Sequence, residues 1–221
     1  IFDSSTLISF AMNGLLVELR MLKEKFDGKF IITKDVKHEI IDKPITIKMF
    51  ELEALKIKQL LDEKILEMPS AAGIDEEILE DRTQELRNIA NTTFFGRDRD
   101  IHLIDSGEAS CLALGKMLDE KKIKNVLAID ERTTRLLCEK PESLERLMDK
   151  KLHTKIKVKK ENYKFFQGFK IIRSSELAYL VYKKRLTKIK DELILDAMLY
   201  GLKFKGCAIS VEEIREIKKI S

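Results

Sequence analysis

The sequence has few of the residues that build disulfide scaffolds or zinc sites. Its 221 residues include only three histidines and three cysteines, Cys111, Cys138 and Cys207. The cysteines are far apart, lie in apolar stretches and form no CxxC or Cys/His spacing. We therefore expect buried free thiols in a reducing compartment and no zinc site.

Long apolar runs are also missing. No stretch of about 18 apolar residues occurs, and no signal peptide is recognisable in the sequence. The sequence thus predicts a soluble, cytoplasmic chain with no membrane partner. Hydrophobic residues make up 44% of the chain, which is enough for one sizeable core.

The charge is distributed unevenly along the chain. Residues 150–190 carry 14 Lys and Arg against two acids, Glu161 and Glu176, a net charge of +12. The rest of the chain has a net charge of −8, so the formal total is +4. A basic segment beside an acidic body is typical of proteins that bind polyanions, and a solvated face is the alternative.

Short apolar runs alternate with stretches of helical periodicity. We predict extended segments at 1–3, 30–32, 64–68, 125–129, 155–159 and 169–172. Helices are predicted at 6–26, from 35 to about 43, and at 46–62, 75–91, 105–118, 175–186 and 191–203, with others after 130 and from 210. Residues 92–100 are predicted to form a loop, and 163–168 the turn of a hairpin.

This alternation favours an α/β fold with three α/β/α layers and a mostly parallel central sheet. No repeat or low-complexity linker divides the chain. We therefore expect a single domain over residues 1–221, with 42–100 as a helical arm or insertion and 150–190 as a basic segment.

Four carboxylates stand at related places in this pattern. Asp3 and Asp130 each end a predicted strand, Glu108 opens a helix, and Glu39 lies on the first turns of another helix. The carboxyl ends of parallel strands meet at one edge of a sheet, so these acids are expected to converge. Converging carboxylates repel one another unless their pKa values rise or cations bind between them. Oxygen ligands favour Mg²⁺ or Mn²⁺.

Helix capping is an alternative role for each acid. Asp3 and Asp130 stand where they could cap the helices that follow them, and Glu39 could be an exposed helix residue. Asp105 and Glu108 have the spacing of an N-cap and N3 pair. Capping does not require acids after different buried strands, so the set as a whole favours a common site.

The order of these motifs resembles the four-acid signature of the PIN-domain nucleases. The resemblance is to the branch with a GEA motif at the third acid, and to its archaeal members in particular. It covers essentially the whole chain and is carried by IFDSSTLI, FIITKDVKHEII, DSGEASCLALG and VLAIDERTTR. It implies a PIN-like fold and a metal-dependent endoribonuclease that hydrolyses phosphodiester bonds in RNA.

Residue by residue, the resemblance implies catalytic and metal-binding roles for Asp3, Glu39, Glu108 and Asp130. Ser5 matches a hydroxyl that supports the first acid, and Asp105 and Glu131 are candidate accessory members. Family members often have Asp where Glu108 and Glu131 stand, which leaves open whether one or two Mg²⁺ or Mn²⁺ ions bind.

Three arginines are candidate phosphate contacts for an RNA that is single-stranded or structured. Arg132 and Arg135 follow Asp130, and Arg173 ends a predicted strand. Arg135 has an alternative partner in Glu139 at i+4. The basic segment would add contacts to phosphates that weaken with salt.

Several alternatives stay open at this point. One is a non-catalytic RNA-binding or assembly module with a degenerate acidic site. Phosphatases of the haloacid-dehalogenase type and receiver domains also use Asp at strand ends, but their flanking patterns fit poorly here. A homodimer through the apolar positions of 46–91 competes with packing of those positions on the sheet. An antitoxin partner is conceivable, but no residue supports it.

Overall fold

The computed structural model describes residues 1–220, and helices dominate it. Helices of all kinds account for 61% of the chain and strands for 6%. The strands form one antiparallel sheet of three strands and one parallel pair. The predicted three-layer α/β/α fold with a mostly parallel central sheet is therefore wrong.

Helices and very short strands follow one another along the whole chain. Residues 1–120 contain α1 (Ser4–Met12), α2 (Leu16–Glu24), α3 (Lys34–Lys37), η1 (His38–Asp42), η2 (Pro44–Thr46), α4 (Glu51–Asp62), η3 (Pro69–Ala72), α5 (Glu76–Asn91), β1 (Phe94–Gly96), β2 (Arg99–Asp100) and α6 (Ser106–Glu120). Residues 121–220 contain β3 (Leu127–Ala128), α7 (Arg132–Glu139), α8 (Pro141–Leu152), β4 (Lys157–Val158), η4 (Lys160–Phe166), β5 (Ile171–Ile172), α9 (Ser174–Lys183), α10 (Ile194–Phe204) and α11 (Val211–Lys219).

Parallel pairing is limited to very short segments. β3 and β5 pair over two residues each, and single parallel bridges join Phe2 to Ala128 and Ile31 to Glu67. The paired segments are short because a helix begins soon after several of them. Asp3, Thr33 and Arg173 are the N-cap residues of α1, α3 and α9. The chain therefore turns into a helix before a longer ladder can form.

The antiparallel sheet has the order β2–β1–β4. β1 and β2 form a hairpin whose tip residues, Arg97 and Asp98, have φ values of 52° and 59°. The loop predicted at 92–100 is thus mostly strand. The hairpin predicted around 163–168 is also wrong, because β4 pairs with β1, β5 pairs with β3, and η4 lies between them.

The helical predictions have a mixed outcome. The predicted helix at 75–91 is confirmed by α5, and the one from 210 by α11, which begins with a capping box at Ser210 and Glu213. The single helix predicted at 6–26 is wrong, since the chain breaks into α1 and α2. Gly14 has a φ of 70° at this break, a conformation that glycine adopts without strain.

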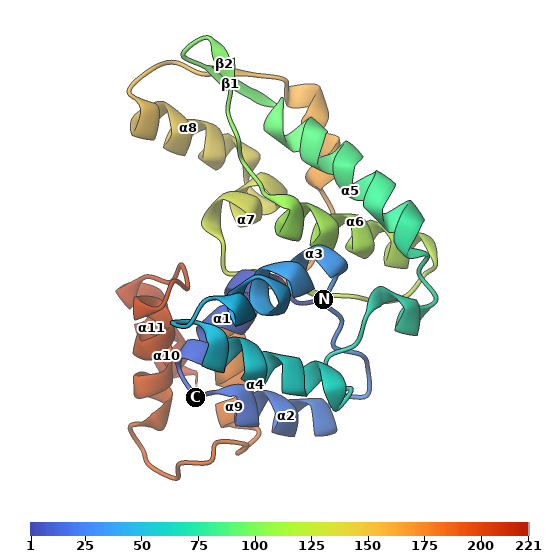
Figure 1. The fold of residues 1–221 in the computed structure, drawn as a ribbon. Helices are drawn as coiled ribbons and strands as arrows, with labels where there is room; N and C mark the ends of the chain where they lie inside the picture. Colours follow the sequence, from blue (N-terminus) through green and yellow to red (C-terminus); the bar gives the residue numbers. More distant parts are fainter. Residues whose placement is uncertain (221) are drawn as a thin grey trace.

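One hydrophobic core runs through the molecule. Figure 1 shows α5, α8 and the β1–β2 hairpin at one end, α2, α9 and α10 at the other, and α3, α6 and α7 between them. The three cysteines are buried and free, as predicted. Among residues 1–220, no single helix has the length and apolarity to cross a membrane. α1 and α2 pass that test only together, bent by 117°.

The fold divides the basic segment. Its first part, up to residue 170, begins in the last turn of α8 and includes β4 and η4, while residues 184–190 follow α9 at the other end of the molecule (Figure 1). The predicted arm at 42–100 contains α4 and α5 but also the strands β1 and β2.

Candidate metal centre

Asp3 is fully buried at the start of α1. Its Oδ2 accepts hydrogen bonds from the Ser5 backbone N–H at 3.1 Å and from the Ser5 hydroxyl at 2.5 Å. Its Oδ1 has no partner. The carboxylate therefore caps the helix with one oxygen and leaves the other free for a ligand.

Asp130, two residues after the end of β3, is buried as well. Its backbone N–H donates to the Ser5 hydroxyl at 3.1 Å, so Ser5 connects Asp3 to Asp130. Asp130 Oδ1 accepts a hydrogen bond from the Ser174 N–H at 2.7 Å, and Oδ2 has no partner. Three chain segments thus meet at Asp130, each contributing one end of a helix or strand.

Glu108 and Glu39 are half-buried near the start of α6. Glu108 Oε2 accepts from the Asp105 N–H at 3.0 Å, so one of its oxygens serves the helix end. A Cβ atom at Gly107 would lie 2.6 Å from Glu39 Oε2, so glycine is what lets the Glu39 carboxylate lie against α6. A hydrogen bond of 2.6 Å between the Thr33 and Ser110 hydroxyls joins α3 to α6 beside it.

These acids affect one another electrostatically. Burial raises the pKa of Asp3 to about 6; hydrogen bonds from Ser5 oppose the shift and the charge of Glu39 adds to it. Burial also raises the pKa of Glu108 to about 7, assisted by the charges of Asp3 and Glu39. The folded protein therefore holds mutually repelling carboxylates that a cation would relieve.

Unpartnered polar atoms gather around Asp130. Seven buried side-chain oxygens among residues 1–220 have no hydrogen-bond partner, and six of them lie on the segments 3–6, 130–134 and 174–175. Their residues are Asp3, Thr6, Asp130, Thr134, Ser174 and Ser175. Native proteins rarely leave buried polar groups unpaired, so this grouping indicates a polar ligand such as an ion or ordered water.

The donors are all oxygens, which suits Mg²⁺ or Mn²⁺. Among residues 1–220, however, no three His, Cys, Asp or Glu side chains lie close enough together to hold a metal ion as they stand. Asp3 and Asp130, each with one unpartnered buried oxygen, are the candidate ligands for a hydrated ion, because Mg²⁺ commonly binds one or two carboxylates and completes its shell with water and phosphate.

The accessory candidates have separate places. Ser5 lies within the site, as described above. Asp105 is exposed and its Oδ1 contacts His102 Nε2 at 2.8 Å. Glu131 caps α7 by accepting from the Thr134 N–H at 2.7 Å. The capping interpretation therefore accounts for Glu131 fully. It is also confirmed for Asp105, which is the N-cap residue of α6 and forms a capping box with Glu108.

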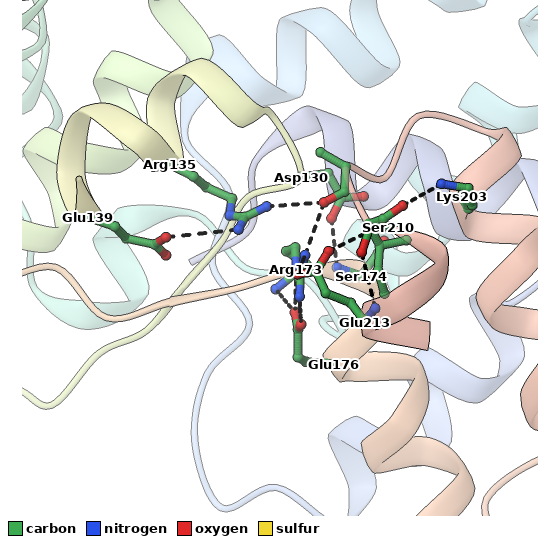
Figure 2. A network of polar contacts seen from close by, with 11 residues as sticks. Asp130, Arg135, Glu139, Arg173, Ser174, Glu176, Lys203, Ser210 and Glu213 are labelled. Carbon is green, nitrogen blue, oxygen red and sulfur yellow. Dashed lines mark hydrogen bonds and ion pairs between the residues drawn. The ribbon is translucent and has the colours of Figure 1, made fainter. Parts of the chain in front are cut away.

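The three arginines predicted to contact phosphate also have different surroundings. Arg132 is exposed on α7. Arg135 lies 3.9 Å from Glu139 and donates to the Ala208 carbonyl at 3.5 Å. Figure 2 shows Arg173 between Glu176 and Glu213, with which it forms ion pairs. The charge of Arg173 is thus already matched within the protein.

A surface cavity of about 410 Å³ lies beside Glu39. Lys34 and His38 are its basic lining residues, and acids predominate. Burial, followed by the charge of Glu80, raises the pKa of Asp35 there. The acidic residues are Asp35, Glu39, Asp42, Glu76, Glu80 and Asp105. Such a lining repels phosphates and other anions.

Comparison with protein-family models found no matching family, and searches of the curated proteins and of the solved structures found no match. The resemblance to the PIN-domain nucleases therefore stays one of sequence motifs.

Ser174 is the residue at Asp130 whose contact the sequence did not predict. Its N–H donates to Asp130 across 44 positions of the chain. The only local signal is Ser174–Ser175 directly after an apolar run, which is equally typical of a helix start. Pairing of β3 with β5 brings the two segments together.

Proposed function

We propose that this protein is a metal-dependent endoribonuclease that hydrolyses phosphodiester bonds in RNA at the Asp3–Asp130 site. The observation that carries the proposal is the pair of buried carboxylates, each with one unpartnered oxygen, joined through Ser5. The four-acid order that resembles PIN-domain nucleases also supports it.

A bound Mg²⁺ or Mn²⁺ would lower the pKa of a water molecule and stabilise charge on the phosphate. Asp3 and Asp130 would hold it, and Ser5 and the Ser174 N–H would keep their unpartnered oxygens oriented. Glu108, whose pKa is raised to about 7, could accept a proton from the attacking water near neutral pH.

A basic strand supports RNA as the substrate. Lys157 in β4 and its neighbours Lys155 and Lys159, together called the β4 lysines, are exposed, while Ile156 is buried. Alternate residues of an extended chain lie about 7 Å apart on one face. None of the β4 lysines forms an ion pair with an acid among residues 1–220. Unpaired lysines in a row suit a phosphate backbone.

The second candidate is an RNA-binding or assembly module without catalysis. One observation favours it: among the residues described, no three acids are close enough to hold a metal ion as they stand. In this alternative the β4 lysines still bind RNA, but the acids neither bind a metal ion nor catalyse hydrolysis.

The test is cleavage of end-labelled single-stranded and structured RNAs in Mn²⁺, Mg²⁺ or EDTA. An Asp3→Asn/Asp130→Asn double variant is compared with Asp75→Asn. Asp75 is an exposed N-cap that accepts from Glu77 and Ile78, so its variant makes the same chemical change at a helix start away from the site.

Cation-dependent cleavage that is lost in the double variant and kept in Asp75→Asn would support the nuclease. RNA binding that is unaffected by EDTA, with no cleavage by the wild type, would favour the binding module. Cleavage that persists in the double variant would refute the assignment of the site.

A further inference from the structure

Arg173 is a mostly buried arginine directly before α9, with a side chain that is 12% exposed. Its Nε donates to both carboxylate oxygens of Glu176, at 2.8 and 3.0 Å. Its Nη1 donates to Glu213 Oε1 at 2.8 Å and to the Ala208 carbonyl at 3.0 Å. One guanidinium thus joins the start of α9, the start of α11 and the segment between α10 and α11.

Three basic side chains hold residues 206–210, which we call the 206–210 turn: Arg173 before α9, Arg135 of α7 and Lys203 of α10. The Ala208 carbonyl accepts from Arg173 and from Arg135 of α7. The Ile209 carbonyl accepts from Lys203 of α10 at 2.6 Å. Figure 2 shows this network beside Asp130 and Ser174.

The turn lies on the Asp130 side of the site. Cys207 is buried, and burial raises the pKa of its thiol, with a further contribution from the charge of Asp130. The Ser174 N–H, which directly follows Arg173, donates to Asp130. The position of Arg173 therefore bears on Asp130 through one peptide unit.

Arginine suits this role because its planar fork can bind several acceptors in fixed directions. Burial alone would lower the pKa of Arg173, but Glu176 and Glu213 outweigh burial and raise it, so the guanidinium stays charged. Removing one partner of such a half-buried network leaves an unmatched charge, which favours its opening.

We propose that Arg173 is a positioning residue that holds Ser174 and the 206–210 turn against Asp130, and so sets the affinity of Asp130 for a divalent cation. This inference rests on the proposed metal site. It assigns α11, through Glu213, a role in that site although α11 contributes no ligand.

The experiment compares Arg173→Gln and Glu213→Gln with the wild-type full chain. Gln at 213 keeps an acceptor for the Ser210 N–H, so the capping box of α11 survives while the charge is lost. The matched control is Asp196→Asn, which removes the ion pair between Asp196 of α10 and Lys218 of α11 without touching Arg173. The readouts are Mn²⁺ affinity by calorimetry and amide hydrogen exchange at Ser174.

Both Gln variants are expected to weaken Mn²⁺ binding about 10-fold, the usual effect of losing a residue that orients a metal ligand. They should also speed exchange of the Ser174 amide, and Asp196→Asn should do neither. If Glu213→Gln and Arg173→Gln bind Mn²⁺ as the wild type does, the inference is overturned while the metal site stands. If Asp196→Asn weakens Mn²⁺ binding equally, general docking of α11 replaces the role of Arg173. If the wild type binds no Mn²⁺, the proposed function itself fails, and the inference with it.

Discussion

Replacing Asp3 by Asn is expected to stabilise the cation-free protein at pH 8. Asp3 is fully buried, and its Oδ1 has no hydrogen-bond partner. Asn keeps an oxygen that can accept the hydrogen bonds from Ser5 and is itself a favoured N-cap residue. The substitution therefore removes the buried charge and preserves the cap of α1.

The size of the effect follows from the pKa of Asp3, which rises from 3.8 to about 6 on folding. One pKa unit corresponds to about 1.4 kcal/mol, so full ionisation of Asp3 lowers the free energy of unfolding by about 3 kcal/mol. Because the folded-state pKa is the higher one, this stability is present below pH 3.8 and is lost as the pH rises through 6. Glu108 acts with the same sign, through a pKa of about 7.

The assay is urea unfolding in EDTA at pH 5 and pH 8, with Asp75→Asn as the control. Asp3→Asn should gain up to about 3 kcal/mol over the wild type at pH 8 and about half of that at pH 5, because the unfolded carboxyl is already ionised there. Adding Mn²⁺ should stabilise the wild type and leave Asp3→Asn unchanged. A loss of stability on Asp3→Asn at pH 8 would refute the reasoning, because the charged carboxylate would then be favourable in the fold.

Three further predictions concern the surface, the acids and the backbone. Replacing the three β4 lysines by Ala should reduce the salt dependence of single-stranded RNA binding: the slope of log K for binding against log salt should fall in magnitude by about 2, measured by fluorescence anisotropy. An equal effect from replacing Lys184, Lys188 and Lys190 at the other end of the molecule would contradict an RNA-binding surface confined to the β4 lysines. Glu108→Gln, which keeps an acceptor for the helix end, should weaken Mn²⁺ binding in calorimetry, whereas Asp105→Asn should not, and the reverse order would exclude Glu108 from the site. Gly14→Ala should lower the free energy of unfolding by about 1 kcal/mol, because the φ of residue 14 is 70°, a conformation that strains alanine. No atom lies within 4 Å of the added Cβ, so no new contact would offset that strain. Increased stability in urea unfolding would contradict this prediction.

Much of the helical structure could be predicted from local sequence. α5 and α11 follow from periodicity and from capping residues such as Asp75 and Ser210, whose interactions lie within a few positions of the chain. The break at Gly14 was missed because apolar spacing continues across it, and a single glycine does not by itself end a helix.

The sheet could not be predicted in the same way. Apolar runs such as 30–32 are extended, but whether they pair depends on partners far along the chain and on how soon a helix cap follows. β4 pairs with β1 rather than with β5, its neighbour in sequence, and η4 separates β4 from β5 along the chain. The pattern of apolar and polar residues within each segment does not specify this pairing.

At the candidate site, the sequence by itself determined which oxygen-bearing side chains stand where an apolar run ends or a helix begins: Asp3, Ser5, Glu108 and Asp130. Only the tertiary structure decided which of them come together. In the folded protein Asp3 and Asp130 are buried on either side of Ser5, and the Ser174 N–H donates to Asp130. Glu131 instead caps α7. The tertiary structure also matched Arg173 with acids rather than leaving its charge free. The physical reason is that burial and hydrogen-bond partners depend on contacts between distant segments, which set both the charge state of a carboxylate and its freedom to bind a cation.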